Sequence, residues 1–421
     1  MSTELEVYLQ SNKVGRLWLD KERHFVFTYD RNWLQNAAAV PLSIRLPLQK
    51  TPYEEAQARP FFTNLLPESD LRRNVARRLG LSEQNDFALL EAVGGECAGA
   101  VSLFPQGEPL SSFADYRPLA PGVLDDLIEE LPRRPLLAGE EGIRLSLAGA
   151  QNKLPVLYRN DQLSLPLGTA PSSHILKPPI EHYANTVENE YYCMRLAERT
   201  GLAAPEVCLL HRRKPLYLIQ RYDRVHGENG NIQRLHQEDF CQALGYLPEQ
   251  KYEKEGGPGL QQCFVLLRER SVQPVADVRA LLDWVIFCYL IGNADAHAKN
   301  ISLLLTPQGP RLAPFYDLMC TALYDELTDR LAMRIGGEDR PDWIIARKWQ
   351  AFADEAGIAW KLVRQRLLAL QQVVAQAASQ LRDEVAGQHG ACPPVYDRIR
   401  DIIAQRAGKL TQALNAEASQ T

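Results

Sequence analysis

The residues Gly292–Asn300 follow an apolar run and precede another, and they carry several polar side chains. Asp295 and Asn300 are separated by the Asp-x-x-x-x-Asn spacing of a kinase catalytic loop. A carboxylate at the first position can orient an acceptor hydroxyl and take its proton, and an amide oxygen at the second can bind a metal ion that bridges phosphates. The same spacing also arises where Asp and Asn cap turns, so other residues must support this interpretation.

A second carboxylate follows in the segment Pro314–Met319. Asp317 lies just after two short β-type runs, where a kinase places its second metal-binding residue. Mg²⁺ prefers oxygen ligands and usually takes one or two from the protein, with phosphates and water completing the shell. Asn300 and Asp317 are therefore predicted to be the metal ligands, with Asp295 as the catalytic base.

A lysine at the end of a predicted strand supports the same chemistry. Lys177 ends the run His174–Lys177, and a helix that carries Glu190 follows it. In a kinase such a lysine contacts the α- and β-phosphates, and a helical glutamate fixes its position. Glu188 is an alternative partner, and a solvated lysine on a strand is the structural alternative.

Two further segments are candidates for nucleotide contacts. The loop Ser146–Lys153 holds three consecutive small residues, which would let backbone N–H groups approach phosphates, although it lacks the Walker pattern and an ordinary hairpin turn is the alternative. The run Tyr217–Asp223 is predicted to be a strand leading into the hinge, where backbone groups of a kinase bind adenine.

The remaining pattern predicts the elements that position these residues. The first thirty residues alternate as short strands, and further strands are expected at Ile143–Leu147, Leu154–Tyr158 and Leu312–Phe315. Helices are expected at Val187–Thr200 and Val278–Ile291, and from Trp343 onward. We predict three parts: a β-rich subdomain over 1–110, a mixed kinase N-lobe with phosphate loop and hinge over 111–236, and a helical C-lobe over 237–421.

Composition excludes several other classes of protein. The 421 residues are 45% hydrophobic and 24% charged, which is typical of a globular protein and excludes a mainly disordered chain. The net charge of −5 gives no general case for direct nucleic-acid binding. No apolar run is long enough to cross a membrane, and no signal peptide is evident, so we expect a cytoplasmic protein whose cysteines are reduced.

Several motifs together resemble the HipA family, the serine/threonine-kinase toxins of HipBA toxin–antitoxin modules. The resemblance covers nearly the whole chain. The motifs are Phe62–Ser69, Ala148–Lys153, Asn189–Cys193, Arg234–Asp239, Gly256–Gly259, Asp295–Asn300 and Phe315–Asp317.

This resemblance implies a bilobal α+β fold of the protein-kinase-like, phosphoinositide-kinase-like type, with an N-terminal β-rich subdomain and a mainly helical C-terminal lobe. It implies ATP and Mg²⁺ as cofactors. It also implies that Ser146 is autophosphorylated, which would expel the phosphate-binding loop because a phosphoserine repels ATP phosphates. The nucleotide-binding residues that it implies are Ala148, Gly149, Ala150, Gln151, Lys153, Lys177, Gln220, Tyr222, Gln237, His297 and Tyr316.

The family also implies partners. These are a HipB-like helix-turn-helix antitoxin dimer, operator DNA reached through the antitoxin complex in a co-repressor role, and glutamyl-tRNA synthetase as a protein substrate. Two departures from the family pattern are Asn152, where an acidic residue is common, and Ala294–Ala296, where Thr-Asp-Gly is usual. Neither removes a catalytic group, so we expect an active kinase.

Two other functions remain open from the sequence. A small-molecule kinase of the aminoglycoside-phosphotransferase type would share the Asp-x-x-x-x-Asn pattern and the second Asp. A catalytically silent protein that binds a repressor would need none of these groups.

Overall fold

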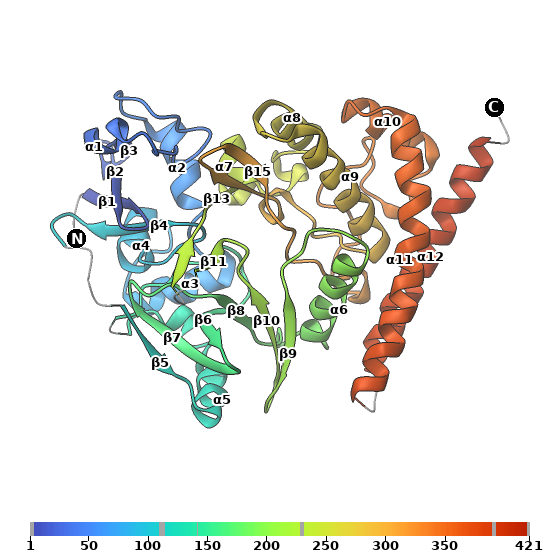
Figure 1. Ribbon diagram of the computed structural model, residues 1–421, viewed down its shortest axis with the longest axis horizontal. Coiled ribbons are helices and arrows are strands. Elements are labelled where there is room, and N and C mark those ends of the chain that lie inside the picture. The colour runs from blue at the N-terminus through green and yellow to red at the C-terminus, as the bar shows by residue number, and fades with distance from the viewer. Residues whose placement is uncertain (1–3, 109–113, 141, 228–230, 390–392, 419–421) are drawn as a thin grey trace. The chain divides into compact units, whose positions relative to one another are not determined.

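The computed structural model describes residues 4–108, 114–140, 142–227, 231–389 and 393–418 (Figure 1). The chain forms two compact units, each built from segments that are distant in sequence. The first unit comprises Met1–Ile180, Leu210–Pro248 and Leu303–Pro310. The second comprises Glu181–Leu209, Glu249–Ser302 and Arg311–Thr421.

The first unit begins with a four-stranded antiparallel sheet in the order β3-β2-β1-β4. β3 alternates buried and half-buried positions, whereas four of the five positions of β4 are buried. Four helices connect the third and fourth strands in sequence. The bounds are β1 Glu4–Leu9, β2 Asn12–Leu19, β3 Phe25–Tyr29, α1 Arg31–Gln35, α2 Glu55–Thr63, α3 Ser69–Leu79, α4 Asp86–Val93 and β4 Val101–Pro105.

A six-stranded sheet follows, in the order β5-β7-β6-β8-β10-β9. Its central strand β8 ends at Lys177, and β10, which pairs with β8, ends at Gln220. The two strands are antiparallel, so Lys177 pairs with Tyr217 at one end and Gln220, where the predicted hinge begins, pairs with His174 at the other. The bounds are β5 Ala114–Pro118, α5 Pro121–Glu130, β6 Leu154–Arg159, β7 Gln162–Gly168, β8 His174–Lys177, β9 Val207–His211 and β10 Pro215–Gln220.

Two small sheets complete the strands. One pairs β11 with β12, and the other has the order β13-β14-β15. A short helix, α7, follows β13 directly and is capped by Asp239. The bounds are β11 Arg224–His226, β12 Ile232–Arg234, β13 His236–Asp239, α7 Phe240–Leu244, β14 Ser302–Thr306 and β15 Gly309–Leu312.

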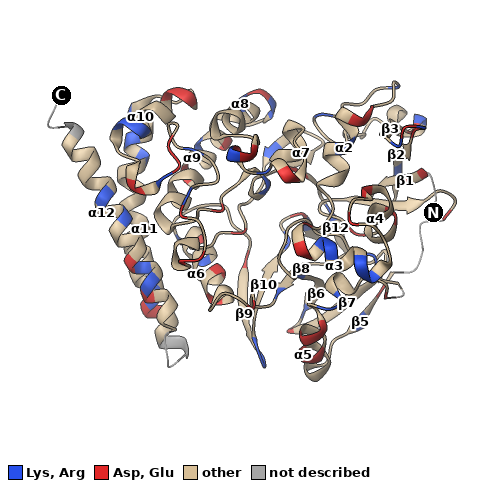
Figure 2. Ribbon diagram, turned by 180° about the vertical axis from the view of Figure 1, so that it is seen from behind, with Lys and Arg blue, Asp and Glu red and all other residues tan. Residues whose placement is uncertain are grey.

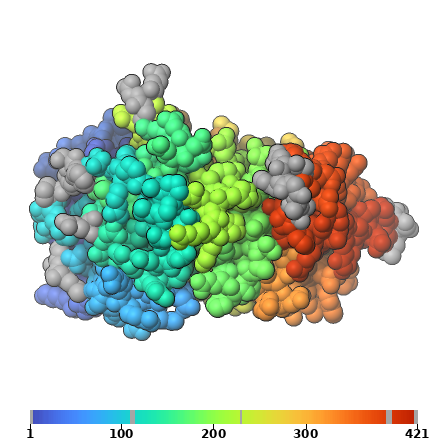
Figure 3. Space-filling model, turned by 90° about the horizontal axis from the view of Figure 1, so that it is seen from below, coloured from blue at the N-terminus to red at the C-terminus, as the bar shows by residue number. Residues whose placement is uncertain are grey.

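The second unit is mainly helical. Its core helix α9 is buried at nearly every position from Leu281 to Ile291, and α8, α11 and α12 pack against it. The long helices α11 and α12 lie side by side and form one orange-to-red surface (Figures 1 and 3). Both helices carry charges of both signs (Figure 2). The bounds are α6 Thr186–Arg199, α8 Leu260–Arg270, α9 Pro274–Ile291, α10 Ala346–Glu355, α11 Trp360–His389 and α12 Pro394–Ala418.

Two strand predictions are wrong. Residues Ile143–Leu147 form no strand, because this segment makes only an isolated parallel bridge between Leu145 and Glu96 while its apolar side chains are buried in a loop. The strand expected at Leu312–Phe315 lies instead at Gly309–Leu312. The apolar residues Ala313 and Phe315 suggested a strand, but they are buried without being part of the sheet. Among the described helices, none combines the length and the apolar character that a membrane crossing requires.

Candidate functional site

The loop that carries Asp295 begins at the end of α9. Gly292 adopts a left-handed conformation with φ +75°, its N–H bonds to Tyr289 O, and the N–H of Asn293 bonds to Cys288 O at 2.9 Å. This is the Schellman arrangement that ends many helices. A β-carbon at Gly292 would lie 2.9 Å from that of Ala322, so glycine is required here for space as well as for conformation. The helix end thus fixes where the loop starts.

Hydrogen bonds within the loop hold its polar residues. Asn293 Oδ1 accepts from Asp295 N–H at 3.0 Å, and Asn300 Oδ1 accepts from His297 N–H at 3.1 Å. The short 3₁₀ helix Ala298–Asn300 turns the chain so that Asn300 is buried while Asp295 remains exposed. The Asp295 residue is therefore exposed to solvent, and the Asn300 amide is held in a fixed orientation.

The structure brings Asp317 to Asn300. The distance from Asn300 Nδ2 to Asp317 Oδ2 is 3.5 Å, across 17 residues of sequence. Asp317 is exposed between two buried residues, Phe315 and Leu318, and the Phe315 ring stacks on Trp284 with ring centres 5.8 Å apart. Asp317 also has φ +55°, a left-handed conformation that is unusual for a residue other than glycine and that clusters at functional sites.

Tyr316 and His297 lie in the same part of the second unit. The Tyr316 hydroxyl donates to Lys299 O at 2.7 Å and lies 2.8 Å from Ser302 Oγ, so it fastens the segment before Asp317 to the residues on either side of Asn300. His297 is buried, and its ring meets Tyr252 edge to face with centres 5.2 Å apart. Glu190 is buried on α6.

Sequence reasoning missed Tyr252. Its hydroxyl donates to Asp295 Oδ1 at 2.6 Å, which orients the carboxylate assigned as the base. Tyr252 lies 43 residues before Asp295, and no local pattern marks it. Only the fold joins the two side chains.

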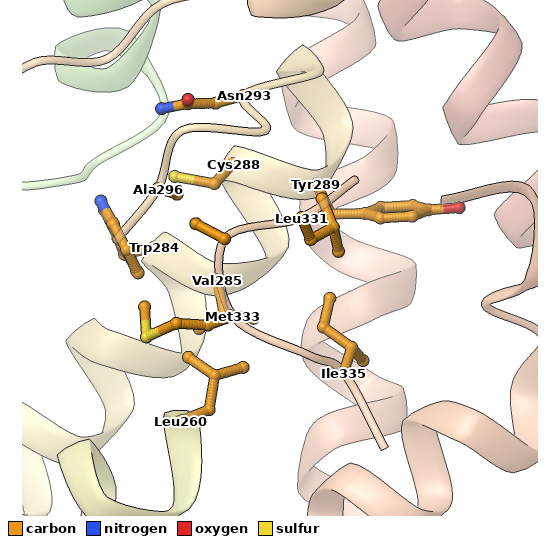
Figure 4. Close-up of a pocket in the computed structure, with 11 residues that line it drawn as sticks. Leu260, Trp284, Val285, Cys288, Tyr289, Asn293, Ala296, Leu331, Met333 and Ile335 are labelled. Atoms are coloured by element: carbon orange, nitrogen blue, oxygen red, sulfur yellow. The ribbon is translucent and has the colours of Figure 1, made fainter. Parts of the chain in front are cut away.

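A small cavity lies under the loop (Figure 4). Its volume is about 20 Å³, room for about one water molecule and far too small for a nucleotide. Side chains from α9 form one wall, and Asn293 and Ala296 contribute from the loop. The predicted catalytic loop therefore packs against mainly apolar side chains. The lining residues are Leu260, Trp284, Val285, Cys288, Tyr289, Asn293, Ala296, Leu331, Ala332, Met333 and Ile335.

In the first unit, the loop Ser146–Lys153 is tied down at several points. Ser146 is fully buried and its hydroxyl donates to Leu65 O at 2.7 Å. Gly149, with φ +103°, makes a parallel bridge with Pro67, and its carbonyl accepts from Glu68 N–H at 3.1 Å. The motif Phe62–Ser69 therefore holds the predicted phosphate loop in place.

The other predicted residues of this loop line its turn. Lys153 Nζ bonds to Ala148 O, and a β-carbon at Gly149 would lie 2.8 Å from that ammonium group. Gln151 Nε2 lies 3.4 Å from Pro178 O, one residue beyond Lys177. Ala150 is exposed within the same turn. The small residues thus leave room for the lysine that closes the loop.

The predicted hinge and β13 are joined in this unit. The Tyr222 hydroxyl donates to Gln237 Oε1, and Gln220 pairs with His174 across β8 and β10. Lys177 is buried at the end of β8, with its ammonium 5.7 Å from the centre of the Tyr217 ring. The pairing of Lys177 with Glu190 stays a prediction, as do the nucleotide-contact roles.

Comparisons with known proteins identify the family. Residues 145–381 match the HipA-like C-terminal domain and residues 5–104 match the HipA N-terminal domain. The chain is 43% identical to the Y4mE protein of Sinorhizobium fredii over 91% of this chain and 92% of that one. It is 34% identical to the serine/threonine-protein kinase toxin HipA of Shewanella oneidensis over 90% of this chain and 89% of that one.

A solved structure agrees with these matches. The chain superposes on a HipA structure from Shewanella oneidensis, solved with HipB and operator DNA, with a TM-score of 0.85 and 30% identity over 98% of both chains. The predicted bilobal α+β kinase-like fold and the prediction of a kinase are confirmed. This chain belongs to the HipA family of serine/threonine-protein kinase toxins of toxin–antitoxin systems.

Proposed function

We propose that this kinase transfers the γ-phosphoryl group of ATP to a serine hydroxyl of a protein, with Asp295 as the base and Asn300 and Asp317 as the ligands of Mg²⁺. The approach of Asn300 to Asp317 within 3.5 Å carries this proposal, together with the exposed Asp295 in the same loop as Asn300. The three side chains come from two segments of one unit, and each supplies the oxygen that its role requires.

The donor set fits a hard divalent cation. Asp317 offers an exposed carboxylate, and Asn300 Oδ1 has a second lone pair beyond the one that accepts from His297 N–H. Within the described residues, no group of three or more His, Cys, Asp or Glu side chains could hold a metal ion, so phosphates and water would complete the shell here. Bound Mg²⁺ would neutralise charge on the phosphates.

The remaining residues would bind the nucleotide. Ala148, Gly149, Ala150, Gln151 and Lys153 would face its phosphates together with Lys177, which Glu190 would position. Gln220 and Tyr222 would form the adenine hinge, and Gln237, His297 and Tyr316 would line the site.

The test compares Asp295→Asn with Asp325→Asn, which changes an exposed aspartate outside this site. Loss of a positioned base is expected to lower phosphoryl transfer by at least about 100-fold. Both variants should bind the ATP analogue AMP-PNP with magnesium and melt at wild-type temperature. Undiminished transfer by Asp295→Asn would contradict the assignment.

Transfer to aminoglycosides but not to proteins would favour the small-molecule kinase. Failure of the wild type to bind the analogue would favour the silent repressor-binding protein.

We further propose that Ser146 is autophosphorylated. Its hydroxyl is buried against Leu65 O, a place where a phosphoserine with a charge near −2 would be repelled and desolvated. The loop must therefore leave this position on phosphorylation. Mass spectrometry after incubation with MgATP should find the phosphate on Ser146 in the wild type and none in Asp295→Asn.

The partners are proposed from the relative's assembly. The similar Shewanella structure contains HipB and operator DNA, which supports an antitoxin dimer of the HipB type and a co-repressor role for this chain. Glutamyl-tRNA synthetase is the proposed substrate and the cytoplasm the proposed location, because ATP and the translation machinery are found there. Radiolabelled transfer to purified synthetase, with Asp295→Asn as the control, tests the substrate.

A further inference from the structure

Asn189 on α6 holds the backbone of the segment after Asp317. Its side chain is fully buried, its Nδ2 donates to Cys320 O at 2.9 Å, and its Oδ1 accepts from Cys320 N–H at 2.9 Å. One amide thus satisfies both backbone groups of a single residue, as a neighbouring strand would. Asn189 Nδ2 also lies 3.2 Å from the Tyr324 hydroxyl.

The next residue joins this segment to the catalytic loop. Thr321 Oγ1 accepts from Ala294 N–H at 2.7 Å and donates to Gly292 O at 3.1 Å. The N–H of Ala322 bonds to the same Gly292 carbonyl at 3.0 Å. Residues 320–322 are therefore bonded to α6 on one side and to the residues just before Asp295 on the other.

The hydrogen bonds of Asn189 and Thr321 fix the chain close to Asp317, one of the two proposed metal ligands. Asp317 has a left-handed backbone, and such a conformation persists only when the surrounding structure enforces it. Asn300 and Asp317 are 17 residues apart, with the β14–β15 hairpin between them, so their spacing depends on how the two chain segments are fastened. Thr321 and Asn189 fix the chain on the C-terminal side of Asp317, at residues 320 and 321.

We propose that Asn189 and Thr321 are positioning residues that set the spacing of Asn300 and Asp317, and through it the affinity for the divalent cation. The inference rests on the proposed function, since it takes these two residues as the metal ligands. Neither positioning side chain is hydrogen-bonded to Asn300 or Asp317. Their effect passes through backbone groups of Cys320, Gly292 and Ala294.

Thr321→Val is the sharpest variant, because it keeps the shape of the side chain and removes only the hydroxyl. Thr321→Ser is its matched control, since it keeps the hydroxyl and loses only a methyl group. Asn189→Asp keeps the acceptor for Cys320 N–H and loses the donor to Cys320 O. Circular dichroism and melting temperature establish that each variant is folded.

The measurement is Mn²⁺ binding by electron paramagnetic resonance in the presence of AMP-PNP, together with the Mg²⁺ concentration that gives half-maximal phosphoryl transfer. Thr321→Val and Asn189→Asp are expected to weaken Mn²⁺ binding at least fivefold and to raise the Mg²⁺ requirement similarly, while Thr321→Ser stays within twofold of wild type. A folded Thr321→Val protein with wild-type metal binding would overturn the inference.

Asp317→Asn separates this failure from failure of the proposed function. This variant should lose most Mn²⁺ binding, because it removes the carboxylate ligand itself. If Asp317→Asn binds Mn²⁺ as tightly as wild type, the metal site is elsewhere, and both the proposed ligands and their positioning residues are wrong. If Asp317→Asn loses binding and Thr321→Val does not, only the positioning role is wrong.

Discussion

The side chains assigned to catalysis differ in how far the sequence reveals them. Asp295, Asn300 and Asp317 could be predicted because kinase chemistry requires these residue types in this order. Tyr252 could not, and Asn189 entered only as part of a family motif with no role attached, since their partners Asp295 and Cys320 lie 43 and 131 residues away. Their roles depend on tertiary contacts, and neither residue type is unusual in its own segment.

Tyr252 gives a prediction for a single hydroxyl. Tyr252→Phe removes the hydrogen bond to Asp295 Oδ1 and is expected to lower kcat about three- to tenfold, in line with a net hydrogen-bond contribution of about 1 kcal/mol. The KM for ATP should change little, because the hydroxyl orients the base and not the nucleotide. Steady-state phosphorylation assays check this, with Tyr183→Phe as the matched control. A kcat equal to that of wild type would show that Asp295 needs no such orientation.

Helices and strands set the positions of these residues, and here the sequence was a partial guide. The long apolar pattern predicts α9, and Gly292 after it gives a clear end. The segment Ile143–Leu147 has the same apolar character as a strand, but it forms a buried loop. Periodicity reports burial, and it does not report which backbone groups pair.

The end of α9 supports a prediction on stability. Gly292→Ala combines a left-handed backbone with a contact of 2.9 Å to the Ala322 β-carbon. Gly201→Ala, just beyond α6, carries the same backbone cost with no atom within 4 Å. We expect Gly201→Ala to cost about 1 kcal/mol and Gly292→Ala clearly more, with lost kinase activity. Urea unfolding measures the free energy of unfolding of both variants. Equal losses would show that the contact with the Ala322 β-carbon does not matter.

Glu238 on strand β13 should make the stability of the protein depend on pH. Glu238 is buried, its Oε2 accepts from Ser43 Oγ at 2.5 Å and its Oε1 accepts from Ile44 N–H at 2.9 Å. Burial raises the pKa of Glu238 to about 8, against 4.5 ordinarily. Its contribution to stability is therefore fully present below about pH 4.5 and is lost as the pH rises from there through 8, by about 1.4 kcal/mol per pH unit.

The comparison that isolates this carboxyl is with Glu238→Gln, which mimics the protonated acid. The stability of wild type relative to Glu238→Gln should fall between about pH 5 and pH 8 and level off above that, as followed by urea unfolding at each pH. Asp239 and Tyr29 both interact electrostatically with Glu238, and both are present in the two proteins. A difference that does not vary with pH would contradict the raised pKa.

At the scale of the whole molecule, the family's sequence segments and the compact units do not coincide. The matched HipA N-terminal domain, residues 5–104, lies entirely in the first unit, together with part of the matched C-terminal domain. A buried ion network joins them: Glu96 bonds to Arg221 and Arg224, and Asp223 bonds to both arginines. The sequence could not show this network, because charged residues are ordinarily expected on the surface.

Removing one charge from this network should destabilise the first unit strongly. Burial acts to raise the pKa of Glu96, but Arg221, Arg224 and Arg234 outweigh it and hold the carboxyl ionised. Glu96→Gln leaves these buried arginines with less opposing charge, at an expected cost of about 3–5 kcal/mol. Asp342→Asn, which breaks the exposed pair with Lys409, should cost less than about 1 kcal/mol. Urea unfolding of both variants tests this: if Glu96→Gln costs no more than Asp342→Asn, the network does not hold the N-terminal segment to residues 221–224.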